Sequence, residues 1–154
     1  MRRPYIFRLE ENKAILRRAF EALNRQDLDS LIELIVPEYV DQPNHLRGEA
    51  DVRRFYTEAF KGFPDFHATL EESIAEGDKV WVRATITGTH KGEYRGIAPT
   101  GKKIEIPVVF VWRIIIGKIA EKESEVNSML SFYKQLGVIE YTEKGKKLFP
   151  EDVK

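Results

Sequence analysis

The spacing of apolar residues changes once along this chain, at Gly62, and that change limits the folds available to it. Before Gly62, apolar residues recur at steps of three and four, which is typical of amphipathic helices. After Gly62 they mostly alternate with polar residues, which is typical of half-buried strands. Helices followed by consecutive strands predict an α+β domain in which the helices cover one face of an antiparallel sheet.

The same spacing predicts where the individual elements lie. We expect helices over residues 10–24, from the N-cap Asp27 to Pro37, and over 49–61. The later elements are expected in this order: strands over 66–74, 79–90, 103–115 and 119–127, then a short helix over 129–136. The strand over 103–115 is apolar on both faces, so both must be covered. Helices would cover one face, and an internal pocket, further core or a dimer partner would cover the other.

Length and composition predict a single domain. The chain has 154 residues, 42% of them hydrophobic, which suffices for one core. No linker of proline, glycine and serine divides it. We assign residues 1–9 to an N-terminal extension and 10–139 to the domain. Residues 140–154 form a charged tail that is expected to be mobile or to contact a partner.

Composition also argues against several classes of function. Basic and acidic residues both number 25, so no net field attracts nucleic acid. There is no cysteine, and the three histidines are too scattered to form a metal site. The longest apolar run, 108–116, is too short to cross a membrane, and no signal peptide precedes it, so we expect a cytoplasmic protein. The 18 Glu against 3 Gln and 4 Asn favour a thermophilic source.

The last expected strand carries the strongest candidates for acid–base chemistry. Alternate positions on one face are Glu121, Glu123, Glu125 and Asn127. A short hairpin at Gly117 would place Glu121 beside Trp112 and Glu123 beside Phe110. A carboxyl buried beside aromatic rings has a raised pKa and can act as a general base. Alternatively, this face meets solvent, since a bulge can reverse which side a residue faces.

Other residues are candidates for ligand contacts. Arg83, in the strand over 79–90, would clamp an anionic substrate, or lie ion-paired on the outer face. His90 lies in the loop before the next strand, near the expected pocket opening. The aromatic side chains that would line a pocket for a flat apolar molecule are Tyr56, Phe60, Phe110 and Trp112. The same rings would serve equally well as core.

The loop after His90 is rich in glycine but does not have the pattern of a phosphate-binding loop. Its segment over 88–102, GTHKGEYRGIAPTGK, does not open a helix and lacks the Lys-Ser/Thr ending. Instead, it resembles the loop signature of SnoaL-like polyketide cyclases, in the superfamily whose fold is named for nuclear transport factor 2. Matching pieces occur in the same order elsewhere in the chain: Asn12-Lys13, Tyr39-Val40-Asp41, Ala75-Glu76-Gly77-Asp78, Gly117-Lys118-Ile119-Ala120-Glu121 and Gln135-Leu136-Gly137.

This resemblance implies a cone-shaped curved sheet, or α+β barrel, closed by three N-terminal helices around a pocket. It implies intramolecular aldol chemistry without a metal or cofactor, with an aspartate near the end of the last strand as acid and base. That aspartate is replaced here, by Asn127 if counted from Gly117 and by Ser128 if counted back from Gly137. A histidine expected after Asp41 is also replaced, by Gln42.

Three functions therefore remain open. The first, which the lost aspartate favours, is a domain that binds a small hydrophobic molecule without catalysis. The second is a cofactor-independent cyclase, isomerase or hydrolase that uses Glu123, Glu125 or another acid. The third is a scaffold that pairs as a homodimer through the face carrying Val109, Val111 and Arg113. A deep pocket with an inward carboxylate favours the enzyme, one without it favours binding, and a filled cone favours the scaffold.

Overall fold

The helical half of the chain forms helices α1 (Tyr5–Asn24), α2 (Leu28–Glu33) and α3 (Gly48–Gly62). They belong to a computed structural model that describes residues 5–153. Helix α1 begins five residues before the expected position 10, so part of the predicted extension 1–9 is helical. The remainder of that extension, residues 1–4, lies outside the described residues.

Helix α2 is shorter than predicted. Asp27 caps it as expected, because its carboxylate accepts a hydrogen bond from the Ser30 backbone nitrogen at 3.1 Å. The helix ends at Glu33 and not at Pro37. The next seven residues, Ile35–Asp41, form strand β1. The proline is tolerated there because the pairing of β1 is irregular between Ile35 and Val40.

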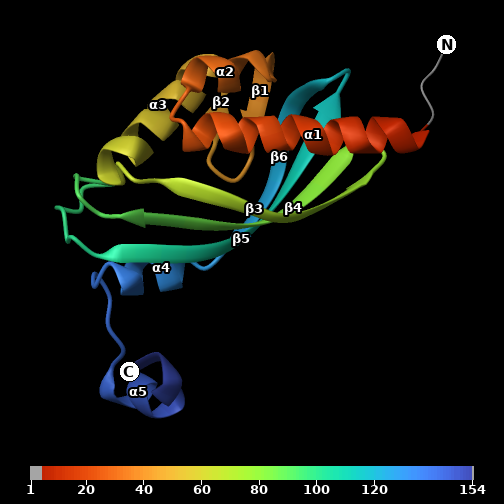
Figure 1. The fold of residues 1–154 in the computed structure, drawn as a ribbon. Coiled ribbons are helices and arrows are strands. Elements are labelled where there is room, and N and C mark those ends of the chain that lie inside the picture. Colours follow the sequence, from red (N-terminus) through yellow and green to blue (C-terminus); the bar gives the residue numbers. More distant parts are fainter. Residues whose placement is uncertain (1–4, 154) are drawn as a thin grey trace.

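The sheet has six strands, in the order β2-β1-β6-β5-β4-β3. Their bounds are Ile35–Asp41 for β1, Leu46–Arg47 for β2, His67–Glu76 for β3, Lys79–Thr89 for β4, Lys103–Ile115 for β5 and Lys118–Asn127 for β6. Neighbouring strands are antiparallel except β1 and β6, which are parallel, so the wholly antiparallel sheet predicted from the sequence was wrong at this pair. The sheet is strongly curved but open (Figure 1), so it is a cone-like half-barrel and not a closed barrel.

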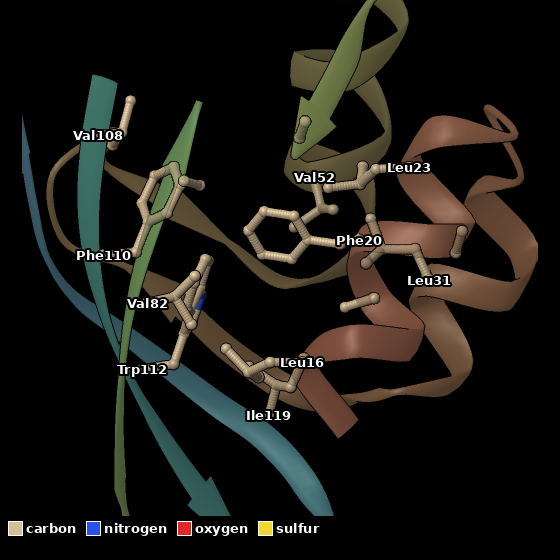
Figure 2. Close-up of a cluster of buried hydrophobic side chains, with 14 of the residues drawn as sticks. Leu16, Phe20, Leu23, Leu31, Val52, Val82, Val108, Phe110, Trp112 and Ile119 are labelled. Carbon is tan, nitrogen blue, oxygen red and sulfur yellow. The ribbon is translucent and has the colours of Figure 1, made fainter. Parts of the chain in front are cut away.

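The core lies between the concave face of this sheet and the helices. Helix α1 runs across that face, and α2 and α3 lie on the same side (Figure 1). Leu16, Phe20 and Leu23 of α1 point toward Phe110 and Trp112 of β5 (Figure 2). The Phe20 ring meets the Phe110 and Trp112 rings edge-on, with centroids 6.3 and 6.0 Å apart, a favourable aromatic geometry. This packing holds β5 and α1 as fixed walls.

The chain ends in helices α4 (Met129–Gln135) and α5 (Glu143–Leu148) and a 3₁₀ turn over Pro150–Val153. Helix α4 lies against β5 beyond the point where β6 ends. There the Gln135 side chain accepts from the Glu105 backbone nitrogen at 2.7 Å and donates to its oxygen at 3.0 Å, so it continues the pairing of β5. Helix α5 lies apart from the sheet (Figure 1). In the described part of the chain, no helix is long and apolar enough to cross a membrane.

Candidate functional site

A cavity of about 590 Å³ opens between the concave face of the sheet and helices α1, α3 and α4. That volume is within the range of small-molecule sites. The apolar walls come from α1, α3, β5 and α4. The principal apolar lining residues are Phe20, Leu23, Phe55, Tyr56, Ala59, Phe63, Phe66, Ile86, Ile104, Ile106, Val108, Phe110, Trp112 and Phe132. The charged or amide-bearing side chains that reach it are few: Asn44, His45, Arg95, Lys122, Glu125 and Asn127.

Exposed residues mark the opening of this cavity. Pro43 and His45 come from the loop between β1 and β2, Arg95 from the loop between β4 and β5, and Met129 from the start of α4. These four exposed residues are called the opening below. Two loops and the start of α4 thus surround the entrance, while the strands and the other helices form the closed interior.

The pairing of β5 with β6 decides which acidic residues face the cavity. Val111 pairs with Ser124, but the next residue, Trp112, pairs with Lys122, so Glu123 is an extra residue in β6. This bulge reverses the alternation that the sequence suggested. Phe110 consequently lies opposite Glu125 and not Glu123, and Trp112 lies opposite Lys122 and not Glu121. The predicted cross-strand pairs were therefore wrong, because a bulge shifts the register.

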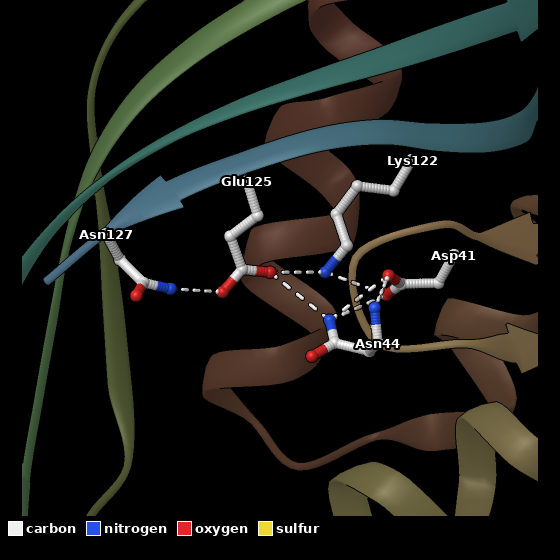
Figure 3. A network of polar contacts seen from close by, with 5 residues as sticks. All are labelled: Asp41, Asn44, Lys122, Glu125 and Asn127. Atoms are coloured by element: carbon white, nitrogen blue, oxygen red, sulfur yellow. Dashed lines mark hydrogen bonds and ion pairs between the residues drawn. The ribbon is translucent and has the colours of Figure 1, made fainter. Parts of the chain in front are cut away.

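Lys122 is the centre of a buried polar network in the wall of the cavity (Figure 3). Its ammonium lies 2.7 Å from Asp41 and 2.8 Å from Glu125. Asn44 donates from its side-chain nitrogen to both Asp41 carboxylate oxygens at 3.1 Å and to Glu125 at 3.2 Å. Asn127 donates to the other Glu125 oxygen at 2.6 Å. Each charged group thus has a partner, which a buried charge requires.

The network is electrically unbalanced. Lys122 and Asp41 are each 3% exposed and Glu125 is 16% exposed, so one cation and two carboxylates share a dry region. Burial alone would lower the pKa of Lys122, but Tyr56, Glu125 and Asp41 around it raise the pKa above its ordinary value, and the ammonium stays charged. Burial raises the pKa of the Tyr56 hydroxyl to about 12, so that hydroxyl stays a neutral hydrogen-bond donor.

Five of the residues singled out from the sequence do line the cavity. They are Tyr56, Phe110, Trp112, Glu125 and Asn127. The structure places them on α3, β5 and β6, around one end of the same space. Because Asn127 contacts Glu125 directly, one of the two positions that would correspond to the family aspartate belongs to the network.

Two predicted residues lie on the opposite, outer face of the sheet. Glu123 is held by Lys79 at 2.8 Å and by Arg113 at 2.5 Å, which lowers its pKa through these hydrogen bonds. Arg83 pairs with Glu72 at 2.9 Å and is half exposed. Neither lines the cavity, because the bulge turns Glu123 outward and because the alternation of β4 turns Arg83 outward.

The remaining three predicted pocket residues do not line the cavity and contribute to packing or hydrogen bonding elsewhere. Phe60 packs on Phe66, behind the cavity wall. Ser128 caps α4 by accepting from the Ser131 backbone nitrogen at 3.0 Å. His90 is fully buried, where its ring stacks on Phe63.

The hydrogen bonds of His90 hold the loop between β4 and β5. Its Nδ1 accepts from the Thr100 backbone nitrogen at 3.2 Å and lies 3.0 Å from the Thr100 hydroxyl. His90 therefore joins the two ends of this loop instead of contacting the cavity.

The face expected to form a homodimer is the outer face of β5. Val109 and Val111 point to it, and Arg113 there contacts Asp78, Glu121 and Glu123. Pairing through this face stays a prediction. In residues 5–153, no group of three or more His, Asp or Glu side chains is placed to hold a metal ion.

Sequence reasoning missed Lys122, Asp41 and Asn44. A lysine among alternating charges has the pattern of a solvent-facing strand, and Asp41 appeared to start a loop. Only the parallel pairing of β1 with β6 brings Asp41 opposite Lys122, and these residues are 81 positions apart in the chain. No local sequence pattern predicts such a contact.

Comparison with known proteins places the chain in a family. Residues 13–136 match the model of the SnoaL-like polyketide cyclases. The aklanonic acid methyl ester cyclase AcmA of Streptomyces galilaeus is 31% identical over 84% of this chain and 92% of its own length. The corresponding cyclase DauD of Streptomyces sp. (strain C5) is 31% identical over 80% of each chain.

Solved structures agree with that match. The structure of AclR from Streptomyces galilaeus superposes with a TM-score of 0.75 at 30% identity, over 86% of this chain and 99% of its own. TsrD from Streptomyces laurentii has the same fold, with a TM-score of 0.77 at 24% identity over 84% of this chain and 97% of its own. By sequence and by fold, the chain belongs to the SnoaL-like polyketide cyclase family.

Proposed function

We propose that the domain binds a flat hydrophobic ketone in its cavity and catalyses a cofactor-independent proton transfer of the aldol type, with Glu125 as the base. The observation that carries this proposal is a carboxylate in the wall of a cavity that is lined mainly by apolar side chains. The inward position of Glu125 supports an enzyme over a scaffold, since a scaffold needs no cavity. The curated relatives named above are cyclases, which supports the same reaction class.

The reaction can be written with this chain's own residues. Glu125 takes a proton from the carbon beside a carbonyl group, and the resulting enolate attacks a second carbonyl carbon of the same molecule. One carbon–carbon bond forms, and the proton returns from Glu125 to the new alkoxide oxygen. Atoms and charge balance without any co-reactant. The neutral Tyr56 hydroxyl, which also lines the cavity, is suited to donate a hydrogen bond to the enolate oxygen.

Lys122 has a supporting role in this scheme. It lies between Asp41 and Glu125 and therefore fixes the rotamer of the base. Because two carboxylates already surround Lys122, it is not free to bind a further anion. We assign it as a positioning residue.

One observation favours binding without catalysis. Both oxygens of Glu125 accept hydrogen bonds, one from Asn127 and the other from Lys122 and Asn44, and such bonds weaken a base. Asn127, one of the two residues that would replace the family aspartate, carries an amide that does not titrate. In this alternative the network only shapes the cavity.

Proton abstraction can be measured without the natural substrate. We would incubate the protein with 2-acetonaphthone in D₂O and follow exchange of its methyl protons for deuterium by NMR. The Glu125→Gln variant keeps the size of the side chain, and we expect it to lose at least about 100-fold in exchange rate. Glu123→Gln is the matched control, because Glu123 is on the same strand but faces outward.

The result separates the two functions. Exchange that depends on Glu125 but not on Glu123 supports the enzyme. Binding of 2-acetonaphthone without exchange by the wild-type protein supports the binding domain. Equal losses in the two variants would contradict the assignment of Glu125 as the base.

A further inference from the structure

The loop between β4 and β5 brings a cation to the opening of the cavity. Tyr94 and Ile97 pair through their backbones, at 3.1 and 2.9 Å, and enclose a two-residue turn. Both central residues have positive φ, 50° at Arg95 and 78° at Gly96, which is the pattern of a type I′ turn. Glycine or asparagine is usual at the first of these positions. An arginine there is conformationally unfavourable, and it carries the only charged side chain of this turn.

The turn is fixed to the core. The Gly62 carbonyl oxygen, at the end of α3, accepts from the backbone nitrogens of Lys91 at 2.9 Å and Gly92 at 3.1 Å. A Cβ on Gly92 would lie 2.1 Å from the Lys61 carbonyl oxygen, so only glycine fits this close approach. The Tyr94 ring packs edge-on against Phe63, with centroids 5.4 Å apart. The position of Arg95 is therefore set by buried contacts.

The side chains around the Arg95 guanidinium are uncharged. Its guanidinium carbon lies 5.3 Å from the centre of the Tyr94 ring. The Tyr94 and Tyr133 side chains beside it are neutral, so they leave its positive charge uncompensated. Within residues 5–153, no carboxylate forms an ion pair with Arg95. A guanidinium has five donors, so free donors remain at the cavity wall.

Lys122 cannot serve the same purpose. Its ammonium is shared by Asp41 and Glu125, and together the three groups carry one net negative charge. A ligand anion would be repelled from this cluster and attracted to Arg95 at the opening. The cavity wall thus carries a net negative cluster around Glu125 and a positive charge at Arg95, and a ligand with one anionic group is oriented with that group toward Arg95.

We propose that Arg95 is a specificity-determining residue that binds a terminal carboxylate, and that the preferred ligand is a flat hydrophobic ketone with this carboxylate at one end. The ketone then lies inward, beside Glu125. This proposal rests on the proposed function in so far as the cavity must bind a ligand. A planar guanidinium fork matches a carboxylate with two parallel hydrogen bonds. The cyclases AcmA and DauD are named for a methyl ester, so a preference for a free acid would set this chain apart.

A matched pair of probes tests the proposal. 6-Acetyl-2-naphthoate has a ketone and a carboxylate at opposite ends, and its methyl ester differs only in lacking the charge. We would titrate both into the wild-type protein and into Arg95→Met by calorimetry. We expect the wild-type protein to bind the acid roughly tenfold more tightly than the ester. In Arg95→Met the two affinities become equal, while the affinity for the ester stays within about twofold of wild type.

Two further variants separate this effect from a general loss of charge. Arg83→Met removes an arginine outside the cavity and should leave the acid-to-ester ratio unchanged. Arg95→Lys should keep part of the preference, because a lysine keeps the charge but not the fork. An unchanged ratio in Arg95→Met would overturn the role of Arg95 and leave the cavity function intact. Failure of both probes to bind the wild-type protein would count against the cavity function itself, and therefore against this proposal too.

Discussion

Glu125 and Glu123 lie two residues apart on β6 and have opposite surroundings. Glu125 faces the concave side, where it joins Lys122, Asn44 and Asn127 in the wall of a cavity. Glu123 faces the convex side and joins the surface ion pairs of Lys79 and Arg113. In a regular strand both would lie on one face. A single extra residue in the ladder therefore decides which carboxylate can meet a ligand.

The two faces also differ in how much their ion pairs contribute to the stability of the fold. On the inner face, charges are almost fully removed from water, so loss of one partner leaves another buried and unpaired. On the outer face, the cations that pair with Glu123 are much more exposed, Lys79 at 44% and Arg113 at 36%, so water screens these pairs and they contribute less. The variants below test this difference, from the largest expected effect to the smallest.

Lys122→Met is expected to have the largest effect on stability. It keeps the volume of the side chain but leaves Asp41 and Glu125 as two buried carboxylates without a cation. We expect the free energy of unfolding to fall by about 3–5 kcal/mol, measured by urea denaturation. Lys79→Met on the outer face, where the lysine is 44% exposed, should cost less than about 1 kcal/mol. Similar losses in the two variants would remove the distinction between the faces.

Asn127→Asp tests one of the two positions that would correspond to the family aspartate. The new carboxylate would lie against Glu125, where an amide now donates a hydrogen bond at 2.6 Å. We expect a loss of about 1–3 kcal/mol at pH 7. Repulsion raises the pKa of the new group in the folded state, so the loss should grow as the pH rises and shrink toward pH 4.

Ser128→Asp is the matched control at the next residue. Ser128 caps α4 through the Ser131 backbone nitrogen, and aspartate is an equally good cap. Its stability should therefore stay near that of wild type at both pH values. A pH-dependent loss in Ser128→Asp, with none in Asn127→Asp, would show that Asn127 does not belong to the inner network.

Alkaline pH should weaken the inner face. In the folded protein the pKa of Tyr56 rises from 10.0 to about 12 through burial, and the pKa of Lys122 is also above its ordinary value. Both shifts favour the protonated form in the folded state. Their contribution is complete below about pH 10 and is lost as the pH rises toward 12.

Tyr56→Phe isolates one part of that effect. We expect the wild-type protein to lose about 1–2 kcal/mol more than this variant between pH 9.5 and 12, measured by urea denaturation at each pH. Parallel pH profiles for the two proteins would indicate that the Tyr56 hydroxyl ionises as readily in the folded chain as in the unfolded one.

Arg83→Ala should have the smallest effect. Arg83 and Glu72 are 54% and 65% exposed, so their ion pair is screened by water. We expect a change in unfolding free energy within about 0.5 kcal/mol and no change in the affinity for 6-acetyl-2-naphthoate. A clear loss of affinity would place a ligand on the outer face of the sheet.

The sequence predicted much of the fold because many elements have a local signal. The helical spacing of Leu16, Phe20 and Leu23, the Asp27 cap and the alternation in β4 each depend on neighbouring residues. Strand β1 was missed because Ile35 continues the apolar spacing of α2, and only pairing with β6 makes Ile35–Asp41 a strand. The curved α+β fold was therefore predictable, whereas its one parallel pair was not.

The site was harder to predict than the fold. The aromatic wall at Tyr56, Phe110 and Trp112 was expected, and Glu125 was among the candidates. The choice between Glu125 and Glu123 depended on a bulge, and no local pattern in this strand of alternating charges predicts that bulge. Lys122 and Arg95 were not singled out. Neither the burial of Lys122 nor the position of Arg95 at the cavity opening can be inferred from neighbouring residues in the sequence.

The most direct test of the account is a crystal structure of the protein grown with 6-acetyl-2-naphthoate. The account predicts the naphthalene ring against Phe110 and Trp112, the ketone beside Glu125 and the carboxylate on Arg95. A probe bound on the outer face, beside the half-exposed Trp81 or the Glu123 ion pairs, would contradict it.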